Sequence, residues 1–534
     1  MANFIPYTQN QLMLLPPDIR EFIPEGHIVY LIDEIVESLD LSSFYRKIKN
    51  DEGGRPCYHP KMLLKVLLYA YIIGIRSSRK IAERLRSDVF FMYLSGMQYP
   101  DFRTISDFRK NNISEIEDVF KQVVLICIEL GVSRVGYIAL DGTKIRASAG
   151  KKKTYKKEQL EKVIREIERE IKEILEEAEE IDKMEDEIYG DREGDKIYKE
   201  ILKREKLKKK IEEAKKKLEE RGWKEINITD FDARFMKHAD NSRNLYYNVQ
   251  LAVDENQIIV ANDVVRDKTD QHQFIPMYEK IKENIKAEPI KICADMGYYT
   301  NKAYVYIYKN KINAYIPDQM FEKEFKNGEI KNSRFSKRNF RYNSKKDAYE
   351  CPEGGLLFYK RSFIKNGVKY KIYKGEDCKI CKVKEFCTVK DYREITVSEA
   401  DFMIEKMRKK LSTDKGKKEY IKRLYTVEPV IGDIKRNMGF TYFLLRGLKK
   451  VRGEFNLICI AHNIKKIYRL IESKKLKSKL RNLEKDLKNI REKIIELFSF
   501  YFKNYFPSKN FPSRQFSDSL LTPLAGGCGC KVRV

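Results

Sequence analysis

Two aspartates of this chain each follow a short, largely apolar run and stand just before a glycine. Asp141 precedes Gly142 directly, and Asp295 precedes Gly297 by two residues. The runs predict buried strands, so each aspartate is expected to present its carboxylate at the rim of a sheet. One strand-end aspartate alone would more often be a turn residue. Two of them indicate that a hard divalent cation is held between them.

Glu428 is the candidate for a third carboxylate. Two-metal phosphoryl transfer places its ions roughly 3.5–4 Å apart, so a further acid must reach in from another element. Pro429 predicts that a helix begins or kinks near Thr426, which would put Glu428 in a first turn. Lys435 lies seven residues beyond Glu428, two helical turns away, and would share its face. A carboxylate for metal and an ammonium for phosphate suit DNA cleavage, and an ordinary charged helix face is the alternative.

The charge of the chain predicts a polyanionic partner. Lysine and arginine outnumber the acidic residues by 107 to 80, which gives the 534 residues a formal net charge of +27. Such an excess creates a long-range field that attracts nucleic acid. A lysine-rich proteome would give the same composition, but DNA is the expected partner. We expect no signal peptide and no membrane span, and the ten cysteines then indicate a reducing cytoplasm.

Four cysteines in the second half of the chain are candidates for a structural zinc site. Cys378, Cys381 and Cys387 form a C-x2-C unit followed by a third thiol, and Cys351 could complete a four-thiolate set. The spacing departs from the usual pair of C-x2-C units, so reduced, unliganded thiols are the alternative. No catalytic role is expected for these cysteines.

The first 130 residues are expected to form helices. An apolar helix opens at Pro60, and a glycine-containing turn separates it from a basic helix that carries Arg79, Lys80 and Arg84. This pair could be a helix-turn-helix that contacts DNA. A plain helical bundle with a solvated basic face is the alternative.

Apolar residues between 151 and 221 recur at spacings of four and three, which is typical of a coiled-coil seam. The pattern breaks at 189–194 and then resumes, which predicts an antiparallel helical hairpin. The pattern does not decide whether the hairpin contacts DNA, a second subunit or neither. The seam consists of Leu160, Ile164, Ile167, Ile171, Ile174, Ala178, Ile181, Leu207, Ile211, Ala214 and Leu218.

The order of the remaining elements predicts an α/β fold with an RNase H-like core. A strand, a hairpin, a helix, a strand, a helix and a strand follow one another, and in that sheet the two aspartate strands would be neighbours. The expected organisation is a helical DNA-binding domain at 1–130, a core at 131–150 and 222–317, the hairpin insert at 151–221, a basic Cys-containing insert at 318–410, the C-terminal part of the core with the third acid at 411–471, and a charged helix with a disordered tail at 472–534.

These motifs, in this order, resemble the DDE triad of bacterial insertion-sequence transposases, and the likeness is closest to the insertion-sequence family eleven-eighty-two. It covers roughly residues 10–470 and is supported by 58–60, 103–109, 229–234 and 246–254. The related signature is Tyr-x2-Arg-x3-Glu-x6-Lys. The signature fits Tyr420, Arg423 and Lys435. Glu428, however, follows Arg423 after four residues instead of three, so Arg423 is expected to lie at a different angle from Glu428 around the helix.

The resemblance implies a DNA transposase that cleaves the ends of its element and joins them to a target. Asp141, Asp295 and Glu428 would hold two Mg²⁺ ions, while Lys435 and Arg423 would contact DNA. The N-terminal helices and the hairpin would bind terminal inverted repeats, and a homo-oligomer on DNA would pair the two ends. The alternatives are a metal-dependent nuclease without joining activity and a catalytically silent DNA-binding protein.

Overall fold

The computed structural model describes residues 18–47, 57–185, 194–237, 241–319, 321 and 334–472. The chain divides into two units, Met1–Arg469 and Leu470–Val534. The tail predicted for 472–534 lies outside the described residues, apart from residue 472. No helix in the described part of the chain is long and apolar enough to cross a membrane.

The N-terminal region is helical, as predicted. Its described helices are α1 (Ile28–Ser38), α2 (Ser42–Tyr45), α3 (Pro60–Ile72), α4 (Ser78–Ser87), α5 (Val89–Ser95), α6 (Phe102–Asn111) and α7 (Ile113–Glu129). Helix α3 starts with Pro60 in its first turn, where a missing N–H costs nothing, and buries most of its residues. Helix α4 is amphipathic, because Ile81 and Leu85 are buried while its basic residues face outward.

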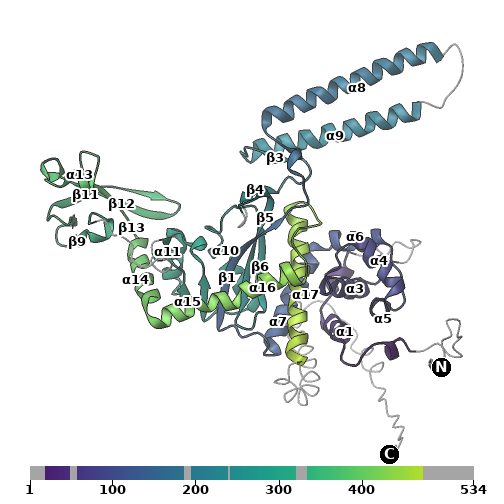
Figure 1. Cartoon of the computed structure of the whole chain (residues 1–534), viewed down its shortest axis with the longest axis horizontal. Coiled ribbons are helices and arrows are strands. Elements are labelled where there is room, and N and C mark those ends of the chain that lie inside the picture. The colour runs from purple at the N-terminus through teal and green to yellow at the C-terminus, as the bar shows by residue number, and fades with distance from the viewer. Residues whose placement is uncertain are drawn as a thin grey trace, which may run out of the picture. The chain divides into compact units, whose positions relative to one another are not determined.

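A mixed sheet forms the centre of the structure (Figure 1). Its strands are β1 (Tyr137–Arg146), β4 (Arg234–Lys237), β5 (Arg243–Asp254), β6 (Ile259–Val265), β7 (Lys291–Ala294) and β8 (Ala314–Tyr315). Strand β5 pairs antiparallel with β1, β4 and β6, whereas β1, β7 and β8 run parallel. Parallel neighbours need crossover connections, and helices α10 (Phe274–Ile285) and α11 (Asn301–Lys309) lie in them.

The C-terminal helices return to the sheet. They are α14 (Ala400–Ser412), α15 (Asp414–Thr426), α16 (Glu428–Gly432), a π-helical turn (Asp433–Asn437) and α17 (Leu448–Glu472). The side chain of Asn463 in α17 bonds to both backbone groups of Ile259 in β6. Gly453 lets α17 approach α7 closely, because a Cβ at this position would lie 2.9 Å from Ile113. Helix α17 therefore joins the sheet to the N-terminal helices.

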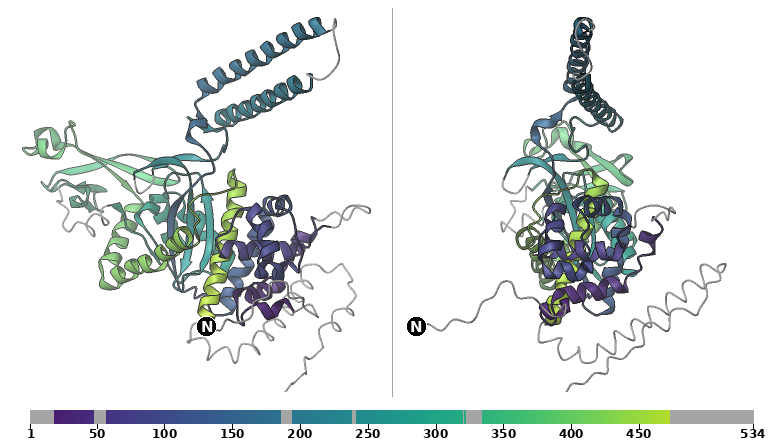
Figure 2. Two further views of the ribbon diagram at one scale, coloured as in Figure 1. Left: turned by 45° about the vertical axis from the view of Figure 1, so that its right-hand side comes forward. Right: turned by 90° about the vertical axis from the view of Figure 1, so that its right-hand side faces the viewer.

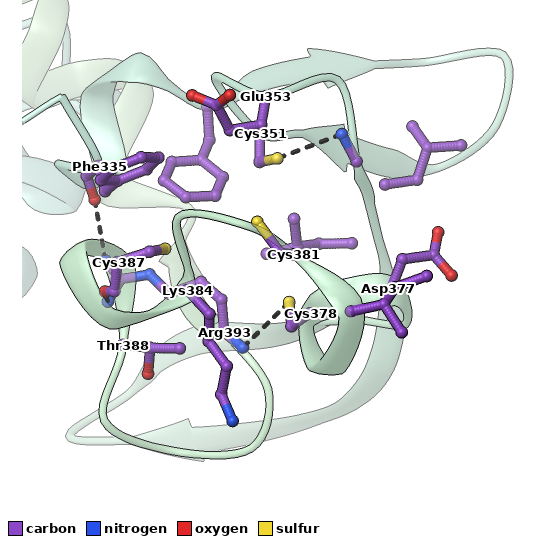
Figure 3. Close-up of a pocket in the computed structure, with 15 residues that line it drawn as sticks. Phe335, Cys351, Glu353, Asp377, Cys378, Cys381, Lys384, Cys387, Thr388 and Arg393 are labelled. Carbon is purple, nitrogen blue, oxygen red and sulfur yellow. Dashed lines mark hydrogen bonds between the residues drawn. The ribbon is translucent and has the colours of Figure 1, made fainter.

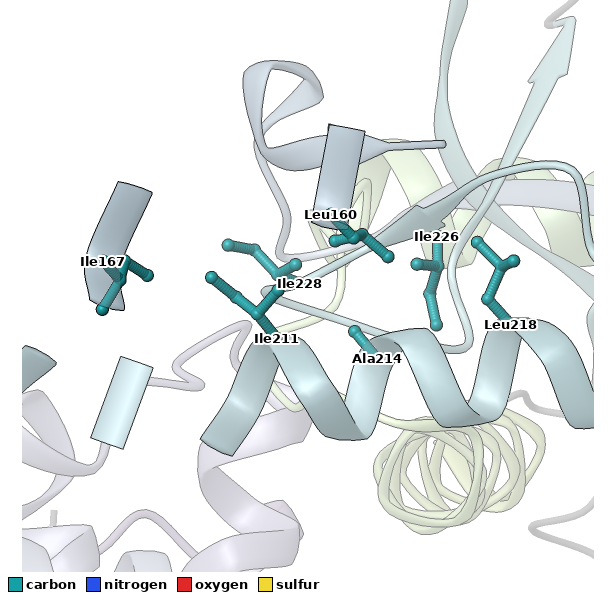
Figure 4. Packing of buried hydrophobic residues seen from close by; sticks show 7 residues of the cluster. All are labelled: Leu160, Ile167, Ile211, Ala214, Leu218, Ile226 and Ile228. Carbon is teal, nitrogen blue, oxygen red and sulfur yellow. The ribbon is translucent and has the colours of Figure 1, made fainter. Parts of the chain in front are cut away.

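The segment between β1 and β4 forms two antiparallel helices, α8 (Lys157–Glu185) and α9 (Gly194–Glu220) (Figures 1 and 2). The short strands β2 (Thr154–Tyr155) and β3 (Ile226–Asn227) pair at their base. Figure 4 shows the buried cluster there, which consists of Leu160, Ile167, Ile211, Ala214, Leu218, Ile226 and Ile228. The seam prediction is wrong for Leu207, which is 42% exposed. The side chains of Ala178 and Ile181 lie outside the described part.

A second, antiparallel sheet lies within the region predicted only as a basic Cys-containing insert. Its order is β13-β12-β11-β10-β9, with β9 (Arg341–Asn343), β10 (Ala348–Glu350), β11 (Leu356–Lys365), β12 (Val368–Gly375) and β13 (Glu394–Ser398). A one-turn helix, α13 (Lys384–Cys387), lies between β12 and β13. The described core of this sheet is small and consists of Phe340, Leu357, Tyr373 and Ile395.

Candidate active site

Asp141 and Asp295 lie side by side, because the parallel strands β1 and β7 place Leu140 opposite Ala294. The strand order thus brings together the two carboxylates that the sequence singled out. Asp295 directly follows its strand, as predicted. The prediction that Asp141 ends a strand is wrong, because β1 passes through Gly142 and continues to Arg146, paired with β5. Asp295 caps a short helical turn by accepting a hydrogen bond from the Gly297 N–H (3.0 Å). The backbone N–H of Gly142 donates to Asp141 Oδ1 (2.8 Å).

A third aspartate, Asp270, joins them from the loop after β6. Its Oδ1 accepts hydrogen bonds from the side-chain amides of Asn248 (2.8 Å) and Gln250 (2.5 Å), both on β5. A Cβ at Gly142 would lie 2.9 Å from Asp270 Oδ2, and a Cβ at Gly297 would lie 3.3 Å from the same oxygen. Both glycines that end the aspartate runs therefore leave space for Asp270.

Sequence reasoning missed Asp270, since it stands in a polar loop and follows no apolar run. A signal for a buried carboxylate was present in the sequence of β5. Asn248 and Gln250 are polar residues within a buried strand, where polar side chains need partners. Their amides point to the carboxylate that they hold.

Glu428 reaches this group of aspartates through Arg423. As predicted, Glu428 stands in the first turn of a helix, α16. Arg423 Nη1 donates to Asp141 Oδ2 (2.9 Å), and Arg423 Nη2 lies 4.0 Å from Glu428 Oε1. The Arg423 side chain is 10% exposed and that of Glu428 is 54% exposed. Arg423 therefore acts as a buried counter-ion of the carboxylates in this structure, and the DNA contact expected of it stays a prediction.

Burial raises the pKa of Asp141 to about 7. The Arg423 guanidinium opposes this shift, and the carboxylates of Asp295 and Asp270 add to it. Three carboxylates so close together concentrate negative charge that a divalent cation would neutralise. Among the residues that the structure describes, however, no three His, Cys, Asp or Glu side chains are arranged so as to hold a metal ion. The suitability of the site for metal rests on its oxygen donors.

Lys435 lies beside the same strand. Its Nζ donates to Thr143 Oγ1 on β1 (2.6 Å). Burial lowers the pKa of Lys435, and the nearby Asp141 carboxylate opposes that shift. The predicted separation of two α-helical turns from Glu428 is wrong, because the π-helical turn that contains Lys435 follows α16. Lys435 nevertheless reaches β1 directly, and Glu428 is linked to Asp141 through Arg423.

Comparisons with known families match two parts of the chain. Residues 350–468 match the Transposase DDE domain, and residues 17–111 match the Transposase domain (DUF772). The chain carries a DDE transposase domain. This domain defines a family of phosphoryl-transfer enzymes, and its matched range includes Glu428 and Lys435 but neither Asp141 nor Asp295. The matches specify no insertion-sequence family, and no curated protein matches the chain.

The N-terminal transposase domain carries the predicted DNA-contacting residues of α4. Arg79, Lys80 and Arg84 are exposed. The Arg79 guanidinium lies over the Phe102 ring, 5.1 Å from its centroid, and Arg84 is 3.6 Å from Asp88. Their contact with DNA stays a prediction.

The turn between α3 and α4 contacts the segment that follows Lys435. The Arg76 guanidinium lies over the rings of Phe440 and Tyr442, at 5.1 and 4.4 Å, and donates to the Tyr442 carbonyl. The ring of Tyr71 stacks on Phe440 at 5.5 Å. The N-terminal transposase domain is thus packed against the segment that positions Lys435.

The four predicted zinc ligands are also brought together. Cys351, Cys378, Cys381 and Cys387 line one cavity beside the second sheet, within the range matched by the DDE domain (Figure 3). All four are free thiols.

Proposed function

We propose that the protein is a DNA transposase of the bacterial insertion-sequence type, closest to family eleven-eighty-two. It cleaves DNA at the ends of its element and joins those ends to target DNA. The observation that carries the proposal is the meeting of three aspartates, with Glu428 linked to them through Arg423. Asp141 lies in the middle of β1, Asp295 directly follows β7, and Asp270 comes from the loop after β6. The strand order β6-β5-β1-β7-β8 supports an RNase H-like core.

Two Mg²⁺ ions suit this site, because carboxylate oxygens are the ligands that Mg²⁺ prefers. Asp141, Asp295 and Glu428 would hold them. When bound, the ions supply Lewis acidity and lower the pKa of an attacking water or 3′-hydroxyl. Arg423 holds Asp141 and Glu428 in place, and Lys435 lies where it can contact a phosphate beside Asp141.

A basic cavity next to β1 supports DNA binding near the carboxylates. It has a volume of about 640 Å³ and is lined by the end of β1 and the segment after it, including Arg146, Lys151, Lys152 and Lys153, and by Arg446 from the segment before α17. Cations grouped in this way bind the phosphate backbone irrespective of sequence. Terminal repeats and target DNA would be the partners, bound by a homo-oligomer in the cytoplasm.

The test is cleavage and joining of labelled DNA that carries the ends of the element, with Mg²⁺ or with EDTA. Glu428→Gln is compared with the wild type and with Glu405→Gln, an exposed glutamate of α14 that serves as the control. The proposal expects metal-dependent cleavage and joining by the wild type and the control, and DNA binding without cleavage by Glu428→Gln. If the wild type cleaves DNA without joining it, the protein is a nuclease. If every protein binds DNA and none cleaves it, the protein is a silent DNA-binding protein. If Glu428→Gln is fully active, the third acid lies elsewhere.

A further inference from the structure

Four cysteines from three short segments face one cavity of about 240 Å³ (Figure 3). Cys351 follows β10, Cys378 lies in a 3₁₀ turn, Cys381 comes directly after that turn, and Cys387 ends α13. We call this space the cysteine cavity.

Backbone groups are arranged around two of these sulfurs. The Gly355 N–H donates to Cys351 Sγ (3.2 Å), and the Arg393 N–H donates to Cys378 Sγ (3.4 Å). A Cβ at Gly355 would lie 3.3 Å from Cys351 Sγ. N–H groups directed at sulfur stabilise thiolate charge, because charge-assisted hydrogen bonds are the strong ones.

The polarity of the cysteine-bearing segment is inverted. Its large apolar side chains are exposed, since Ile380, Phe386 and Val389 are 83%, 79% and 101% exposed, and Ile380 lines the cavity beside the thiols. The buried cluster beneath it consists of four residues, with Tyr349, Cys351 and Val397 packed against it. Apolar burial therefore supplies little of the stability that fixes this segment, and small folds of this kind usually need a metal or disulfides.

We propose that Cys351, Cys378, Cys381 and Cys387 bind one Zn²⁺ ion as a four-coordinate structural site. This proposal is independent of the transposase activity. The thiols do not converge on a metal position in the described arrangement. Zn–S bonds of about 2.3 Å put sulfurs about 3.8 Å apart, so binding requires the cysteine side chains to rotate toward one common point in the cavity.

Binding releases the four thiol protons and leaves a net charge of −2 on the Zn²⁺ and its four thiolates. Lys384 and Arg393 line the same cavity and offset that charge. Because protons compete with the metal, affinity for zinc should rise with pH.

The experiment is elemental analysis of the full-length protein purified under reducing conditions. Wild type is expected to contain about one zinc per chain, and Cys378→Ser/Cys381→Ser should lose it. Cys57→Ser is the control, because Cys57 is exposed and does not line the cysteine cavity. A chelator should lower the unfolding temperature of the wild type and of the control but not that of the double variant.

Cobalt titration of the wild type keeps the proposal testable if the double variant fails to fold. Thiolate-to-cobalt charge-transfer absorption and tetrahedral d–d bands are expected after the zinc is removed. Equal zinc content in wild type and double variant would overturn the proposal. A wild type that contains no zinc and gives no such cobalt spectrum would also overturn it. An intact mass of the wild type that is lower by the hydrogens lost in disulfide formation would do the same.

Discussion

Gly142→Ala tests whether the close approach of Asp270 to β1 matters for stability and catalysis. The added Cβ would lie nearest to Asp270 Oδ1, 2.7 Å from Cγ and 2.9 Å from Oδ2, whereas ordinary contacts between carbon and these atoms are at least ~3.4 Å. Asp270 would have to move by about 1 Å, a displacement set by Oδ1. Its Oδ1 is held by Asn248 and Gln250, so the shift must strain or break those hydrogen bonds. Overpacking of this kind costs about 1–3 kcal/mol.

The same shift displaces a carboxylate beside Asp141 and Asp295, and misplacement by about 1 Å can slow catalysis by ~100-fold. Urea unfolding and DNA cleavage would be measured together. Gly136→Ala is the matched control, because Gly136 precedes the same strand and a Cβ there meets no described atom within 4 Å. Gly142→Ala/Asp270→Ser should regain stability without regaining activity. If Gly142→Ala behaves like Gly136→Ala in both assays, Asp270 does not belong to the site.

Three further predictions follow from the charges. In EDTA, the folded state should hold a proton on Asp141 up to about pH 7, whereas the unfolded chain loses it near pH 3.8. The free energy of unfolding, compared with that of Asp141→Asn, should therefore be highest below pH 3.8 and fall as the pH rises to about 7. A difference between the two proteins that stays constant from pH 4 to 8 in urea unfolding would refute this prediction. Arg423→Lys should slow cleavage by about 10- to 100-fold without changing DNA affinity in a gel shift, because the compact ammonium of lysine cannot reproduce the planar guanidinium fork that reaches Asp141 with one nitrogen and Glu428 with the other. Lost affinity would instead support a DNA contact. Replacing Arg79, Lys80 and Arg84 with alanine should weaken DNA binding and reduce its salt slope by about 2–3 at unchanged unfolding temperature, and an unchanged slope would remove α4 from the interface.

The strands and helices around the aspartates could be predicted because local patterns decide them. The helix expected between the hairpin and the second aspartate strand is α10, and the aspartate runs lie in β1 and β7. Their apolar side chains are buried in a sheet, so the continuous apolar runs identify them. The end of β1 was not predictable from Gly142, because the strand continues through it to Arg146. The meeting of Asp141 and Asp295 then follows from strand order alone.

The second sheet escaped prediction for the opposite reason. Strand β11 is exposed along most of its length, so its sequence does not alternate between apolar and polar residues. One signal was available in the turn Asn366-Gly367, where both residues have positive φ (53° and 76°). Such Asn-Gly turns favour a two-residue hairpin, and β11 and β12 flank this one.

The position of Arg423 shows why spacing alone was insufficient for the third acid. In an unbroken helix, residues five apart lie about 140° apart around the axis, which would separate Arg423 from Glu428. Pro429 interrupts the helix, because it has no N–H to donate to the Tyr425 carbonyl. That carbonyl instead accepts a hydrogen bond from the Gln257 side chain (3.2 Å). Helix α15 ends at Thr426 and α16 begins at Glu428, so the extra residue falls at the break and Arg423 still lies within 4.0 Å of Glu428.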